Sequence, residues 1–179
     1  MTWTLIVLGV LAIVLWGFYI SWRASRLDRL HNRVEAARTA LDLAMVRRSS
    51  AAYELASSGL LDPATSLLLA DAVRRAMEAD PAERDLAESD LTRALRATFS
   101  QPGCRSEIEG EDGAKELLAD VDSSAHQVFI ARKFYNDVAA RTIYARRRPL
   151  ARVFRLAGNA ARPEFFEIDD ALADGDGLG

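Results

Sequence analysis

The side chains best suited to bind a metal or to act as a nucleophile are few and scattered in this sequence. His31 and Glu35 are four residues apart, a spacing that puts two ligand groups on one face of a helix. Two ligands do not make a metal site, so a solvated or capping role is the favoured interpretation. Cys104 lies in a predicted loop beside Arg105, and we interpret it as an ordinary free thiol.

Signatures of the common catalytic sites are missing from the sequence. No serine lies in a nucleophile-elbow pattern, and the segment 110–113 lacks the lysine and the flanking strand of a phosphate-binding loop. We therefore predict a non-catalytic protein that holds neither a metal nor a cofactor. A competing hypothesis is a metal-dependent or hydrolytic site in the core of a helical bundle, which would need inward carboxylates and histidines in pairs.

Arg132, Tyr135 and Asn136 form a polar group inside an otherwise apolar pattern. Arg132 and Tyr135 fall on the inward face of a predicted helix. Burial there removes the hydration of a guanidinium or a phenol, so each must find a hydrogen-bond partner or carry an uncompensated desolvation cost. We interpret the three residues as a polar core network that fixes the register of the helix. A ligand contact in a groove between helices is the alternative.

A basic stretch near the end of the same helix contains Arg146, Arg147, Arg148 and Arg152. It suggests a solvated helix face, a docking patch for an acidic partner, or a site for anionic lipids. If the last long helix runs away from the membrane, its end lies roughly 50 Å from the surface, beyond the range of charge attraction in salt. On that geometry a solvated face is favoured, with partner docking second.

The segment Thr2–Trp22 has no charged residue and is mostly apolar. A helix of roughly 20 such residues crosses a hydrocarbon core about 30 Å thick. Trp3 lies at one end and Tyr19 and Trp22 at the other, where amphipathic rings favour the headgroup level. A cleaved signal peptide is disfavoured because no Lys or Arg precedes the segment and no small-residue cleavage site closes it. The sequence therefore predicts a retained transmembrane helix.

The charges that flank this segment predict its orientation. Arg23, Arg26, Arg29 and Arg33 follow it, whereas no charged side chain precedes it. By the positive-inside rule, the N-terminus lies outside and the rest of the chain lies in the cytoplasm. The single cysteine fits a reducing compartment, and the net charge of −3 gives no basic excess that would indicate nucleic acid.

The remaining sequence has the three-and-four spacing of amphipathic helices. We expect the first helix to run from the membrane segment to about Ala56, and a helix to begin at each of Asp62-Pro63 and Asp80-Pro81. Whether Pro81 separates two helices or kinks one is left open. After a loop over 100–113, a long helix spans about 114–146 and a short helix spans 150–157. The acidic tail from Asp169 onward is expected to be disordered.

Apolar positions on the expected helices are the basis of the predicted core. They are Leu27, Leu30, Val34, Ala37, Leu41 and Ala44; Leu67, Leu68, Ala72, Val73, Ala76 and Met77; Leu86, Leu91, Leu95 and Phe99; and Leu118, Val121, Ala125, Val128, Ala139 and Thr142. We predict an all-α chain in which a transmembrane helix (1–22) precedes an antiparallel three- to four-helix bundle (23–158) and a tail (159–179). An intermolecular coiled coil is the alternative.

Three sequence blocks resemble a known family. They are Leu30-His-Asn-Arg-Val34 with Arg47-Arg48 downstream, Ile130-Ala-Arg-Lys-Phe-Tyr-Asn-Asp137, and Phe154-Arg-Leu-Ala-Gly158 followed by Phe165-Phe-Glu167. With these blocks the chain resembles the LemA family of bacterial membrane-anchored helical proteins, as a divergent member that lacks the second Tyr-Asn pair. The resemblance implies one anchor and a cytoplasmic antiparallel helical bundle, and it brings no catalytic residues.

The sequence thus predicts a membrane-anchored cytoplasmic module for protein–protein interaction or scaffolding in the inner or plasma membrane. Its expected partners are the membrane itself and either an unidentified cytoplasmic protein or further copies of the chain, with no nucleic acid. The alternatives are the enzyme site described above and a membrane-organising role.

Overall fold

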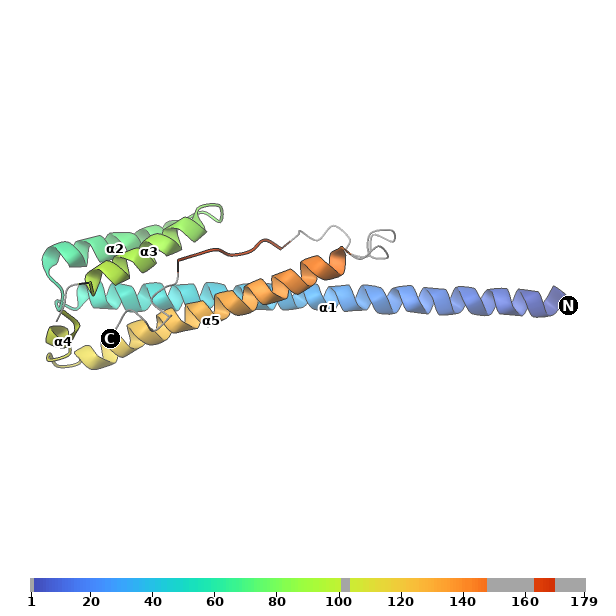
Figure 1. Cartoon of the computed structure of the whole chain (residues 1–179), viewed down its shortest axis with the longest axis horizontal. Helices are drawn as coiled ribbons and strands as arrows, with labels where there is room; N and C mark the ends of the chain where they lie inside the picture. Colours follow the sequence, from blue (N-terminus) through green and yellow to red (C-terminus); the bar gives the residue numbers. More distant parts are fainter. Residues whose placement is uncertain (1, 101–103, 148–162, 170–179) are drawn as a thin grey trace. The chain divides into compact units, whose positions relative to one another are not determined.

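A computed structural model describes residues 2–100, 104–147 and 163–169. Its helices are α1 (Thr2–Ser57), α2 (Pro63–Glu78), α3 (Arg84–Thr98), α4 (Cys104–Ile108) and α5 (Ala114–Arg146) (Figure 1). Within these ranges no residue belongs to a strand, which confirms the all-α prediction.

Helix α1 is continuous from the apolar segment into the polar part of the chain, as the sequence predicted. It ends where Gly59 adopts a φ of 79°, a left-handed conformation that is accessible to glycine because it has no Cβ. The backbone N–H of Ser58 donates to the carbonyl of Leu55 at 3.3 Å and closes the last turn.

The start of α2 confirms the predicted cap, and the start of α3 does not. Asp62 Oδ1 accepts hydrogen bonds from the backbone N–H groups of Ala64 (3.0 Å) and Thr65 (3.1 Å). The segment Asp80–Glu83 instead forms a turn, in which the N–H of Glu83 donates to the carbonyl of Asp80 at 2.9 Å. Because α3 begins only at Arg84, Pro81 separates two helices rather than kinking one.

The predicted loop over 100–113 contains the short helix α4, which the sequence analysis missed. Arg105 of α4 bonds Asp122 of α5, a contact between residues too far apart for local spacing to reveal. Gly113 has a φ of 78° and directly precedes α5, whose bounds match the prediction.

The chain divides into two compact units. Unit 1 comprises Met1–Ala37 and Asn136–Phe165, and unit 2 comprises Arg38–Tyr135 and Phe166–Gly179. Helices α1 and α5 each contribute to both units. The predicted boundaries after residues 22 and 158 stay predictions.

Unit 2 contains one buried apolar cluster to which all five helices contribute. Its members are Ala51, Ala52, Leu55 and Ala56 of α1; Leu69, Ala72, Val73 and Ala76 of α2; Leu91 and Leu95 of α3; Ile108 of α4; and Ala114, Leu118 and Val121 of α5. Burying the large members of such a cluster contributes about 1.5 to 3 kcal/mol each, an upper estimate for an extended unfolded chain.

The predicted core positions are largely buried on α1 and α5 but not on α2. Leu67, Leu68 and Met77 were expected in the core and are exposed, while Leu69 takes the inward position. Leu86 of α3 is also exposed. Neighbouring leucines left the face of α2 ambiguous, and contact with α3 selects the stripe through Leu69, Ala72, Val73 and Ala76.

Contacts within unit 2 give the directions of the helices. Arg84 bonds Asp42 at 3.2 Å and Arg48 bonds Glu88, so residue numbers rise together and α3 runs parallel to α1. Arg47 donates to Gln127 at 3.2 Å, and Arg38 lies 5.9 Å from the ring centroid of Tyr135. In these two contacts the residue number falls on α1 while it rises on α5, so α5 is antiparallel to α1.

The helix order assumed for the basic stretch is therefore wrong. That order assumed that the segment between α1 and α5 runs back along α1 once. The turn at Pro81 instead divides it into two helices, one running back along α1 and one running forward again. The last long helix consequently runs back along α1 rather than away from its N-terminal segment. The antiparallel bundle itself stays a prediction, supported by these contacts.

We predict that Asp62→Ala lowers the melting temperature at neutral pH, because α2 loses its cap, and that Asp62→Asn does so much less. The hydroxyl and backbone of Thr65 hold the pKa of Asp62 below its ordinary value of 3.8. A carboxyl with a lowered folded pKa stabilises the fold above its unfolded pKa and loses that contribution as the pH falls through the folded value.

The measurement is thermal unfolding by circular dichroism from neutral pH to below pH 3.8. The difference between the wild type and Asp62→Ala should shrink on acidification. A difference that is independent of pH, or an equally large loss in Asp62→Asn at neutral pH, would contradict the prediction.

Candidate functional site

The most concentrated polar chemistry of unit 2 lies between α1 and α3. Arg48, Glu88 and Thr92 are only 2%, 3% and 0% exposed. Arg48 Nη1 donates to Thr92 Oγ1 at 2.8 Å, and Nη2 donates to the Glu88 carbonyl at 3.1 Å and to its carboxylate. Thr92 Oγ1 also donates to the Glu88 carbonyl at 3.1 Å. One guanidinium thus joins a side chain, a backbone carbonyl and a carboxylate of α3.

This network is suited to hold two helices together rather than to catalyse a reaction. The carboxylate of Glu88 is engaged by a guanidinium, which is a poor proton donor or acceptor at neutral pH. Arg48 Nε is buried and has no hydrogen-bond partner, so part of the charge remains unsatisfied. Buried ion pairs add little net stability, but they penalise any shift of register that separates the charges.

Sequence reasoning missed this network, although the signal was present. The three-and-four steps through Leu41 and Ala44 continue to Arg48, Ala51 and Leu55. On α3, the stripe through Leu91 and Leu95 likewise includes Glu88 and Thr92. An arginine on one apolar stripe and a glutamate on another would have predicted a buried pair between them.

An adjacent stripe of α3 holds an extended segment from the C-terminal part of the chain. The backbone N–H of Glu167 donates to Asp85 at 3.1 Å, and that of Asp169 donates to Ser89 Oγ at 3.1 Å. The Asp169 carboxylate also pairs with Arg96 at 2.9 Å. The backbone N–H groups of two alternate residues, Glu167 and Asp169, therefore donate to side chains that are one helical turn apart on α3.

Phe166 and Ile168 of this segment are buried, while Glu167 between them is exposed. The sequence analysis placed 159–179 in a partly disordered tail, with disorder expected from Asp169 onward, so the packing of 166–168 does not contradict that prediction. The alternation of apolar and acidic residues was too short to identify a strand, and the segment instead packs as a single extended stretch. Residues 159–162 and 170–179, and the predicted helix at 150–157, lie outside the described part of the chain.

Arg105 forms a second polar centre, which joins α4 to α5. Its Nη1 donates to Asp122 Oδ1 at 3.2 Å, its Nε donates to Glu109 at 3.3 Å, and its guanidinium lies 5.4 Å from the ring centroid of Phe99. Hydrogen bonding to Asp122 raises the pKa of Arg105 above its ordinary value. Arg105 is thus a structural link between α4 and α5, and Cys104 begins α4 rather than lying in a loop.

The predicted polar core residues are only partly inward. Tyr135 is 2% exposed, and the guanidinium of Arg38 lies 5.9 Å from its ring centroid. Arg132 and Asn136 are half-buried. The inward position of Tyr135 agrees with the sequence pattern, whereas Arg132 does not share the burial of Arg48. The role of the three residues as a register-fixing network stays a prediction.

The candidate metal ligands His31 and Glu35 meet each other, but no third ligand joins them among the described residues. His31 Nε2 lies 3.5 Å from Glu35 Oε1 within one helix. His126 stacks on Phe129 with the ring centroids 6.2 Å apart, and Asp122, four residues earlier, is engaged by Arg105. Across residues 2–100, 104–147 and 163–169, no three His, Cys, Asp or Glu side chains are grouped as a metal site would require.

The basic stretch is described only in part. Arg146 is the last residue of α5, Arg147 follows it and is exposed, and Arg148 and Arg152 lie outside the described residues. The end of α5 belongs to unit 1, together with the N-terminal part of α1. For Arg146 and Arg147 this corrects the expectation that the stretch lies far from the apolar segment.

No protein-family model, no curated protein and no solved structure matches this chain. The resemblance to the LemA family therefore depends on the three sequence blocks alone and stays a prediction.

We predict that Arg48→Met and Glu88→Leu each lower the free energy of unfolding by about 3 to 5 kcal/mol, because each leaves an unpaired buried charge. The double variant Arg48→Met/Glu88→Leu should lose less than either single variant, since it buries no charge. The measurement is urea unfolding of the full chain in a mild detergent, followed by circular dichroism.

Arg74→Met is the matched control, because Arg74 forms exposed ion pairs with Asp71 and Glu78 on α2. It should change the stability little. If the losses of the two single variants simply add in the double variant, Arg48 and Glu88 are not energetically coupled and the register argument fails.

Proposed function

We propose that this chain is a single-pass membrane protein whose remaining helices form an antiparallel bundle at the cytoplasmic face and serve as a non-catalytic interaction module. The proposal combines an apolar helix that needs a non-aqueous environment with a polar helical part whose buried charges serve internal contacts.

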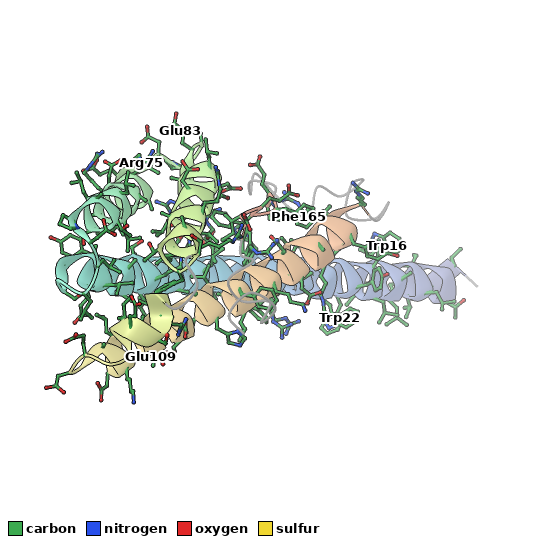
Figure 2. All side chains as sticks on the ribbon, turned by 60° about the vertical axis from the view of Figure 1, so that its left-hand side comes forward. Trp16, Trp22, Arg75, Glu83, Glu109 and Phe165 are labelled. Atoms are coloured by element: carbon green, nitrogen blue, oxygen red, sulfur yellow. The ribbon has the colours of Figure 1, made fainter. Side chains whose placement is uncertain are left out.

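The apolar N-terminal part of α1 is the observation that carries the proposal. Thr2–Tyr19 has a mean hydropathy of 2.0, and none of it is buried against the rest of the chain. Trp16 and Trp22 project from the helix (Figure 2). Soluble monomers rarely expose contiguous apolar surface of this extent, because removing such surface from water lowers the free energy by roughly 25 cal/mol for each square ångström. Length and composition alone also fit a signal sequence, which extraction with alkaline carbonate distinguishes from a retained anchor.

The distribution of charge supports a cytoplasmic helical part. Four arginines follow the apolar segment within residues 23–33, and the segment itself contains no charged side chain. The positive-inside rule assigns such a flank to the cytoplasmic side.

Exposed apolar side chains of unit 2 support an interaction role. Leu43 of α1 and Ile130 and Phe134 of α5 are more than half exposed. Leu43 precedes Arg47 by one helical turn, and Ile130 follows Gln127 by one turn. The hydrogen bond between Arg47 and Gln127 therefore places these apolar side chains along the same line between α1 and α5. Such a surface suits a protein contact better than a catalytic site.

We predict that Leu8→Arg/Ile13→Arg moves the chain out of the membrane fraction. Each arginine at the centre of a spanning helix opposes insertion by about 2.5 to 3.5 kcal/mol. The measurement is the share of the chain that stays with membranes after extraction with alkaline carbonate.

Leu67→Arg/Leu68→Arg is the control, because these leucines of α2 are similarly exposed and lie outside the apolar segment. It should leave the distribution unchanged. Wild-type chain that carbonate extracts from the membrane, or that lacks its first residues when purified, would exclude a retained anchor.

The interaction role predicts that a photoreactive amino acid in place of Phe134 cross-links to a defined neighbour in intact cells. The same residue in place of Glu83, at the exposed turn between α2 and α3, should give a weaker or different pattern. Mass spectrometry of the adducts identifies the neighbour as another protein or as a second copy of this chain. Only monomeric chain at both positions would contradict the interaction role.

A further inference from the structure

The formal charge of −3 conceals a separation of charge between the two units. By sequence, unit 1 contains 11 arginines and 4 acidic residues, a formal charge of +7. Unit 2 contains 12 basic and 22 acidic residues, a formal charge of −10. Unit 1 is also the unit that contains the apolar segment Thr2–Tyr19. By sequence, most of the positive charge therefore belongs to the unit that contains the candidate span.

Both long helices contribute described arginines to unit 1. Arg29 and Arg33 follow the apolar segment on α1, while Arg146 and Arg147 lie at the end of α5, which Figure 1 shows beside α1. Arg29, Arg33 and Arg147 are exposed, and among the described residues none of the three takes part in an ion pair.

The arginines of α2 and α3 differ in this respect. Every arginine of these two helices pairs with a carboxylate: Arg74, Arg75, Arg84, Arg93 and Arg96. An internal acidic partner thus accounts for those arginines, and Asp137 accounts in the same way for Arg141 of unit 1, but among the described residues none accounts for Arg29, Arg33 and Arg147.

We propose that Arg29, Arg33 and Arg147 form a basic collar that binds the headgroups of anionic phospholipids where α1 leaves the membrane. The inference rests on the proposed membrane anchoring, to which it adds the class of lipid and the side chains that contact it. It makes the end of α5 a second point of attachment to the membrane.

The spacing along α1 brings the collar within range of the headgroups. Arg29 is seven residues after Trp22, which corresponds to roughly 10 Å of helix at 1.5 Å per residue. The headgroup region extends roughly 5 to 7 Å beyond the hydrocarbon core, and the Debye length at physiological ionic strength is about 8 Å. Long arginine side chains also extend toward the interface. Arg29 therefore lies within the field of the lipid surface, and Arg33 one turn further out.

The same charges are less suited to an acidic protein or to nucleic acid. Unit 2 carries −10, so a free polyanion that approaches the chain meets net repulsion over most of its residues. A membrane surface is held next to unit 1 by the apolar segment and needs no further attraction to reach the collar. Each basic residue near an anionic surface then adds to the binding.

The chain provides its own probe for the test. Its three tryptophans are Trp3, Trp16 and Trp22, and all of them lie in the predicted membrane segment Thr2–Trp22. Energy transfer from tryptophan to a dansyl-labelled lipid therefore reports which lipids surround the anchor. The full chain is reconstituted in phosphatidylcholine vesicles with a trace of dansyl-phosphatidylglycerol or of dansyl-phosphatidylcholine.

We expect stronger transfer to the anionic probe than to the neutral one. Arg33→Gln/Arg147→Gln, with one change in α1 and one directly after α5, should lower the preference for the anionic probe by on the order of fivefold for each arginine. High salt should lower it in the wild type. The matched control Arg74→Gln/Arg75→Gln removes the same charge from unit 2 and should keep the preference.

Equal transfer to both probes in the wild type overturns the collar, and so does an equal loss in the α2 control. If the preference for the anionic probe survives Arg33→Gln/Arg147→Gln, these arginines do not bind the lipid headgroups. The assignment is equally wrong if this variant keeps its lipid preference but loses a cross-link to another protein, because the arginines then bind a protein. These failures leave membrane anchoring standing if the reconstituted chain resists alkaline carbonate. Chain that is extracted by carbonate refutes the proposed function instead.

Discussion

The contact between Arg48 and Glu88 is the constraint on which the arrangement of unit 2 depends. It fixes α3 along α1 at a single register, because any slip would leave a guanidinium and a carboxylate buried apart. Once α3 is fixed, its adjacent stripe presents Asp85 and Ser89 to the backbone of 167–169. The apolar cluster supplies most of the favourable free energy, while the buried pair specifies which way its members face.

The turn that contains Pro81 has an equally large effect on the direction of the chain. By dividing the middle of the chain into α2 and α3, it adds one reversal before α5. The C-terminal end of α5 therefore belongs to the same compact unit as the apolar segment. Without that reversal the arginines at 146–147 would lie far from the apolar segment and could not add to the positive charge of its unit.

Local signals predicted much of the fold. The three-and-four spacing located α1 and α5, and Asp62-Pro63 located the start of α2, because capping and periodicity depend on residues within one or two turns. The sequence pattern did not identify the face of α2, the short helix α4 or the packing of 166–169. Each of these is decided by contacts between distant residues, such as Arg105 with Asp122 and Glu167 with Asp85. The pair of Arg48 and Glu88 was visible in principle, because both residues continue apolar stripes that the sequence already showed.

The attachment of residues 166–169 to α3 also bears on the order in which the chain folds. The hydrogen bonds involved join residues about eighty positions apart, so they form only after nearly the whole described chain has been synthesised. Until then the stripe of α3 that carries Asp85 and Ser89 is not covered by Phe166 and Ile168. During synthesis, α3 would present a surface to chaperones that the finished protein no longer offers.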